Sequence, residues 1–126
     1  MPEREKIQLE YLLKCSPKVL FSRLNSASGL SEWFAENVKV KGNTYSFFWD
    51  GSEHVAEKLF DREGKQVRYR WLDMPEECYF EFKVVQDELT NDVSLNIIDF
   101  VEPDEMDESI ELWNRQIVGL KRVIGS

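Results

Sequence analysis

Apolar and polar side chains alternate near the start of the chain and predict a strand over residues 6–14. Successive side chains of a strand point to opposite faces, so positions two apart share a face. The apolar positions on the shared face are Ile7, Leu9, Tyr11 and Leu13. Lys6, Gln8, Glu10 and Lys14 lie on the other face, which is typical of a strand with one face on a core and the other in water.

Two short helices are predicted after this strand. Ser16 can cap a helix whose first residue is Pro17, because proline at that position loses no hydrogen bond. Apolar residues at helical spacing then predict a helix over residues 17–25. The small residues 26–29 indicate a break, and the apolar positions of residues 30–35 predict a second short helix.

Residues 37–101 alternate between β-type segments and turn residues, a pattern typical of an antiparallel meander. Asp50-Gly51 and Glu63-Gly64 are candidate hairpin corners, because glycine adopts positive φ without a Cβ clash. The predicted strands cover residues 37–41, 44–49, 53–61, 66–72, 78–86 and 93–101. With the first strand, this makes seven.

The last segment, residues 105–124, is predicted to be one long amphipathic helix. Its apolar side chains recur every three or four residues: Ile110, Trp113, Ile117, Leu120 and Ile124. Acidic residues crowd its first turns, basic ones its last, and a glycine stands at the C-cap position. We expect an α+β fold in which a curved seven-stranded antiparallel sheet wraps this helix, as a single domain over residues 1–126.

The order of these elements resembles the START-like superfamily, also called the helix-grip, birch-pollen-allergen-like or SRPBCC fold. Residues 16–21 followed by 30–34 are similar to the run from the first strand through the two short helices in these proteins. Trp113 with residues 119–123 is similar to the terminal helix of the branch containing activators of the ninety-kilodalton heat-shock chaperone ATPase.

The resemblance implies a cavity between sheet and helix, which many members fill with a lipid, sterol, polyketide or other apolar molecule. Some members are cyclases or dehydratases that use the cavity, and the co-chaperone members bind a protein with an outer surface. We expect a non-enzymatic domain that binds a small apolar or aromatic ligand. A co-chaperone-like interaction module and a cyclase or dehydratase type of enzyme are the alternatives.

Strand parity places an unusual number of aromatic rings on the face that would meet the terminal helix. Such rings suit a flat, apolar ligand, but they also suit a filled core, and the sequence leaves both interpretations open. The candidate ligand-binding residues are Trp33, Phe34, Phe47, Trp49, Tyr69, Trp71, Phe80, Phe82, Trp113 and Ile117.

Candidate polar chemistry is sparse. His54, the one histidine, and Arg70 could anchor a ligand if a strand bulge turned them inward. An enzyme would require His54, Glu57, Arg70 or Tyr69 to converge in the cavity. No metal-ligand spacing or glycine-rich phosphate loop is present in the sequence, so neither a metal nor a cofactor is expected.

Charge and composition narrow the partners. The net charge of −8 repels phosphate backbones, so nucleic acid is disfavoured. The chain shows no signal-peptide pattern and no apolar run near the about 20 residues of a membrane span. Cys15 and Cys78 are interpreted as reduced thiols, and a cytoplasmic location is expected. A small apolar molecule or a protein is the expected partner.

Overall fold

Seven strands form one antiparallel sheet, with three α-helices, in the computed structural model, which describes residues 4–62 and 64–125. The strands are β1 Glu5–Leu13, β2 Asn37–Lys41, β3 Thr44–Trp49, β4 Ser52–Arg62, β5 Gln66–Trp71, β6 Phe80–Gln86 and β7 Val93–Val101. The helices are α1 Pro17–Ser22, α2 Ala27–Leu30 and α3 Met106–Ile124, the last preceded by a 3-10 turn over Pro103–Glu105. The α+β class and the seven strands are confirmed.

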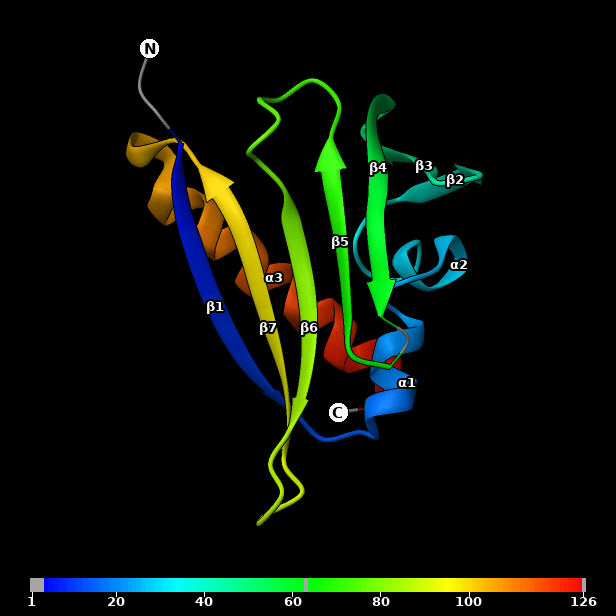
Figure 1. The fold of residues 1–126 in the computed structure, drawn as a ribbon, viewed down its shortest axis with the longest axis vertical. Coiled ribbons are helices and arrows are strands. Elements are labelled where there is room, and N and C mark those ends of the chain that lie inside the picture. Colours follow the sequence, from blue (N-terminus) through cyan, green and yellow to red (C-terminus); the bar gives the residue numbers. More distant parts are fainter. Residues whose placement is uncertain (1–3, 63, 126) are drawn as a thin grey trace.

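The strand order is β1-β7-β6-β5-β4-β3-β2. The meander from β2 to β7 thus keeps its sequence order, and β1 is the edge strand beside β7. Glu5 pairs with Val101 and Leu13 with Val93 along that last ladder. Figure 1 shows α3 crossing one face of the sheet, with α1 and α2 on the side of β3 and β4. No helix in the described part of the chain has both the length and the apolar character to cross a bilayer.

Turn chemistry explains the tight corner between β3 and β4. Asp50 and Gly51 have φ values of 49° and 79°. Two consecutive positive φ angles are what a two-residue hairpin turn needs to match the strand twist. The corner predicted at Asp50-Gly51 is therefore confirmed, whereas Glu63 of the other predicted corner lies outside the described residues.

The second short helix was predicted at the wrong place. It covers Ala27–Leu30 instead of residues 30–35, because Ser26 caps it by accepting a hydrogen bond from the Gly29 amide at 3.0 Å. The small residues taken for a break are the helix itself. A Cβ at Gly29 would lie 2.3 Å from the Ser22 carbonyl oxygen, so this close approach of the two short helices requires glycine there. The first helix also ends earlier than predicted, at Ser22.

The core lies between α3 and the sheet face turned toward it. Strand parity is confirmed for β3, β5 and β6, whose alternate residues are buried on that face, and β7 alternates in the same way. On the helix side, the buried residues are Trp113, Ile117 and Leu120. The amphipathic period of the terminal segment therefore identified the packed face correctly.

Side chains of the sheet donate hydrogen bonds to two carbonyls in the turn between α1 and α2. The Tyr69 hydroxyl donates to the Leu24 carbonyl at 2.7 Å. The Asn25 carbonyl accepts from the Lys58 ammonium at 2.9 Å and from the Tyr45 hydroxyl at 3.3 Å. Since a buried carbonyl without a partner costs free energy, these bonds stabilise the turn between α1 and α2 against the sheet and close one end of the core.

Tyr69→Phe tests how much this fastening contributes. The change leaves the Leu24 carbonyl buried without its donor, and we expect the free energy of unfolding to fall by about 1–3 kcal/mol in urea denaturation. Tyr11→Phe is the matched control, because its hydroxyl donates to Asn114 at 2.6 Å in an exposed position where water can replace it. Equal losses in the two variants would contradict this account.

Candidate ligand-binding pocket

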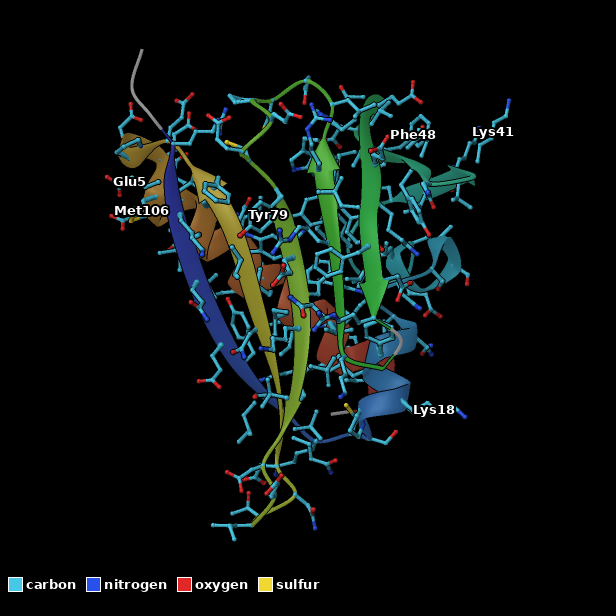
Figure 2. The ribbon with its side chains drawn as sticks, viewed as in Figure 1. Glu5, Lys18, Lys41, Phe48, Tyr79 and Met106 are labelled. Atoms are coloured by element: carbon cyan, nitrogen blue, oxygen red, sulfur yellow. The ribbon has the colours of Figure 1, made fainter. Side chains whose placement is uncertain are left out.

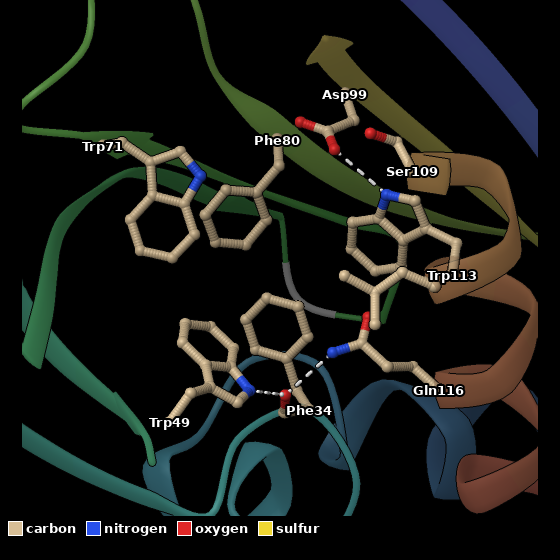
Figure 3. Close-up of a pocket in the computed structure, with 9 residues that line it drawn as sticks. Phe34, Trp49, Trp71, Phe80, Asp99, Ser109, Trp113 and Gln116 are labelled. Atoms are coloured by element: carbon tan, nitrogen blue, oxygen red, sulfur yellow. Dashed lines mark hydrogen bonds between the residues drawn. The ribbon is translucent and has the colours of Figure 1, made fainter. Parts of the chain in front are cut away.

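A pocket of about 390 Å³ lies between one end of the sheet and α3 (Figure 3). In an antiparallel sheet the ends of alternate strands and the starts of their neighbours meet at one edge. The ends of β3 and β5 and the start of β6 each supply a ring there. The lining residues are Phe34, Trp49, Trp71, Phe80, Asp99, Ser109, Leu112, Trp113 and Gln116.

Five aromatic rings form the walls. Figure 3 shows Trp71 and Phe80 on one side, Trp49 and Phe34 on the other, and Trp113 at the α3 end. The Trp71 and Phe80 ring centroids lie 4.8 Å apart, and those of Phe34 and Trp49 lie 5.3 Å apart. Neighbouring rings thus support each other in the tilted and edge-on geometries that aromatic pairs favour.

Two hydrogen bonds to one carbonyl hold these walls in place. The Phe34 carbonyl accepts from the Trp49 indole N–H at 2.9 Å and from the Gln116 side-chain amide at 3.0 Å. The first bond ties β3 and the second ties α3 to the turn after α2. Because the Trp49 indole N–H already donates to a carbonyl within the protein, its ring is held in place without a ligand.

Asp99 is the ionisable side chain of the pocket. Its Oδ2 accepts from the Trp113 indole N–H at 3.0 Å, and its Oδ1 accepts from the Phe100 amide at 2.8 Å. Burial raises the pKa of the Asp99 carboxyl, and these two bonds and the charge of Arg4 only partly oppose the increase. The pocket therefore combines an aromatic wall with a poorly compensated carboxyl group.

The ten predicted ligand-binding residues divide into two groups. Five line the pocket: Phe34, Trp49, Trp71, Phe80 and Trp113. The other five are buried in the packed core beyond it: Trp33, Phe47, Tyr69, Phe82 and Ile117. The filled core and the cavity, which the sequence left as alternatives, thus occupy different parts of the same interior.

The two predicted polar anchors lie outside the pocket. His54 is exposed, with its ring centroid 5.5 Å from that of Trp49 and 6.3 Å from that of Trp71, so it stands beside the aromatic wall. Arg70 lies opposite Glu57 in the β4–β5 ladder. Its side chain is on the outer face of the sheet, away from α3. A bulge is present in β4, between Lys58 and Phe60, but it does not turn Arg70 inward.

The residues that a cyclase or dehydratase site would need do not converge. Tyr69 is buried in the core, where its hydroxyl bonds the Leu24 carbonyl. Glu57 is exposed, and His54 and Arg70 lie on opposite faces of the sheet. The arrangement thus offers no acid–base pair built from these four side chains.

Four lining residues were missed in the sequence: Asp99, Ser109, Leu112 and Gln116. Asp99 had a readable signal, because it follows the buried positions 93, 95 and 97 of β7 on the inward face, where an apolar residue is expected. Ser109 and Gln116 stand four residues before and three after Trp113, so the helical period would have placed them beside it, whereas Leu112 directly precedes Trp113 and has no such signal.

The pH dependence of stability should report the raised pKa of Asp99. Between the ordinary value of 3.8 and the higher folded value, the folded chain binds more protons than the unfolded chain, so the stability contributed by this group falls as pH rises. We expect the unfolding free energy of Asp99→Asn, minus that of wild type, to increase with pH and then level off. Urea denaturation at several pH values measures it.

Asp87→Asn is a contrasting control. Backbone hydrogen bonds from Thr90 and Leu89 lower the pKa of the Asp87 carboxyl, so the folded chain binds fewer protons there. The same difference should therefore decrease as pH rises. A flat or decreasing difference for Asp99→Asn would show that its carboxyl is not destabilised by burial.

Comparisons with known proteins agree with this architecture. A Bacteroides fragilis protein solved in solution is 38% identical, with a TM-score of 0.69, over 96% of this chain and 91% of that one. The Aha1 dimer of Colwellia psychrerythraea is 20% identical, with a TM-score of 0.80, over 95% and 96% of the two chains. A Mesorhizobium loti protein is 16% identical, with a TM-score of 0.79, over 96% and 97%.

A search of curated proteins returned no match. The family model that describes the START-like superfamily domain matches residues 1–126, the whole chain. The two short helices after β1, the meander and the long terminal helix that delimits the pocket are thus those of a known family. This chain belongs to the START-like superfamily.

Proposed function

We propose that this protein is a non-enzymatic START-like domain that binds a small apolar or aromatic molecule in the pocket between the sheet and α3. The observation that carries the proposal is the pocket itself, about 390 Å³ in volume and walled by five aromatic rings. Pockets for small molecules fall in the range of about 300–1,000 Å³ and combine apolar walls with a few polar groups.

The fixed walls favour binding over collapse. Trp49 and Trp113 use their indole N–H groups in internal hydrogen bonds, so their rings are held without a ligand. Preformed walls reduce the ordering cost of association. On the α3 side, Leu112 is half exposed beside the rings, so apolar surface is available to a guest at the edge of the pocket.

Leu112→Trp tests this by obstructing the pocket with a larger side chain. We expect the neutral dye N-phenyl-1-naphthylamine to gain fluorescence with wild type, and Leu112→Trp to weaken its binding by about tenfold, which corresponds to about 1.4 kcal/mol. Val118→Trp is the matched control, because Val118 is similarly exposed on the same helix and does not line the pocket. No dye binding to wild type, or equal effects of both variants, would overturn the proposal.

A protein-interaction role of the co-chaperone type is the second candidate. The fold of the Colwellia Aha1 supports it, together with a cluster on the outer face. There, Arg68 lies 4.0 Å from the ring centroid of Tyr79 (labelled in Figure 2) and forms a 2.6 Å ion pair with the buried Glu81. Beside it, the buried Nε of Arg70 has no hydrogen-bond partner among the described residues. Arginine and tyrosine are enriched at interface hot spots.

Two measurements distinguish this candidate from ligand binding: the affinity of the protein for a purified ninety-kilodalton heat-shock chaperone, and the ATPase rate of that chaperone in its presence. The interaction role predicts a complex that Arg70→Ala weakens by about tenfold or more, as expected for a hot spot. Lys83→Ala, an exposed position on the same face, is the control and should change little. Absence of a complex with wild type would remove this candidate and leave the pocket proposal unaffected.

A further inference from the structure

The pocket contains a carboxylate but no basic side chain. Among the described residues that line it, Asp99 is the one ionisable group, and the others are five aromatic residues, a leucine, a serine and a glutamine. Figure 3 shows the carboxyl group close to Trp113 and Ser109, on the side of the pocket formed by α3. A ligand in this pocket therefore meets negative charge at one end and ring surfaces elsewhere.

The charge of Asp99 is only partly compensated. Its two oxygens accept one neutral N–H each, from Trp113 and from the Phe100 backbone, and each carboxylate oxygen can accept a second bond. The titratable neighbours are Arg4, whose charge acts on the carboxyl, and the thiol of Cys78. Arg4 lies 3.6 Å from a carboxylate oxygen of Glu102, so its charge is shared with that residue. Acceptor capacity for a positively charged donor thus remains at Asp99.

The rings around this carboxylate favour the same kind of ligand. The faces of tryptophan, tyrosine and phenylalanine attract cations, tryptophan most strongly, and this attraction grows as water is removed. Three of the five rings are indoles: Trp49, Trp71 and Trp113. An anionic ligand would instead meet both the Asp99 carboxylate and the net charge of −8 of the chain.

We propose that the pocket is selective for an organic cation, a flat apolar molecule that carries a protonated amine. The ammonium group donates to the Asp99 carboxylate, and the hydrocarbon part lies against the indole rings. This inference rests on the proposed function and adds the charge of the ligand to it. Ser109, on the α3 side of the pocket, supplies a hydroxyl oxygen that can accept from the ammonium group as well.

Three probes with one ring system test the charge preference: 2-naphthylmethylamine, 2-naphthalenemethanol and 2-naphthoate. Titrations at pH 7, followed by the NMR signals of the indole N–H groups, give the three dissociation constants. We expect the protonated amine to bind about tenfold or more tightly than the alcohol, and the carboxylate to bind most weakly. Asp99→Asn should reduce the preference for the amine to about twofold or less, while the alcohol still binds.

Asp107→Asn is the charge-matched control, because Asp107 is exposed in the first turn of α3 and does not line the pocket. It should keep the full preference for the amine. If it loses as much as Asp99→Asn, the effect comes from the overall charge, and the inference is overturned. An alcohol that binds wild type as tightly as the amine overturns the inference and leaves ligand binding standing, whereas no binding of any probe overturns both.

A pH series in the His54→Gln background provides a second measurement that does not depend on the folding of Asp99→Asn. Removing His54 removes the imidazole ring beside Trp49 and Trp71. Because a protonated Asp99 attracts no cation, the preference for the amine over the alcohol should decline as pH falls through the pKa of the carboxyl group. A preference that is unchanged down to the pH where the protein unfolds would count against the inference.

Discussion

Phe34 holds the interior of this domain together. Its ring lies within 6 Å, between centroids, of six other aromatic rings: Trp33, Phe47, Trp49, Phe80, Phe82 and Trp113. Its carbonyl oxygen accepts hydrogen bonds from β3 and from α3. Since one residue of the turn after α2 contacts both the sheet and the long helix, the relative positions of all three depend on it. The pocket walls depend on it in the same way.

The interior is closed at one end and hollow at the other for a physical reason. At the closed end, α1 packs across the sheet, and side chains of β4 and β5 donate to the carbonyls of the turn that follows α1. Apolar residues there touch one another, as close packing requires. At the other end, the rings of β3, β5 and β6 meet α3 at Trp113 and its flanking residues. The hydrogen bonds of the Trp49 and Trp113 indoles hold these two large rings in place and oppose collapse into the remaining space.

Asp99 connects the stability of the fold with the shape of the pocket. A carboxyl group at an inward position of β7 costs free energy where valine or isoleucine would gain it, because burial disfavours its charged form. The hydrogen bond from the Trp113 indole N–H offsets part of that cost and at the same time holds one wall of the pocket in place. Buried ionisable groups with shifted pKa values are commonly found at functional sites. The serine and glutamine of α3 give the same part of the pocket its remaining polar character.

The sequence alone determined the class of fold, the seven strands, and the inward faces of β3, β5, β6 and the terminal helix, because periods of two and about 3.6 record which side chains share a face. It misplaced α2, because the apolar spacing of residues 30–35 was given more weight than the local cap by Ser26, and because the close approach at Gly29 depends on contacts with the end of α1. Only the tertiary structure decided which inward rings pack and which line a pocket. The period of the sequence predicts the face on which a ring lies. Whether that ring packs against the helix or lines a pocket depends on the distance between sheet and helix at that point.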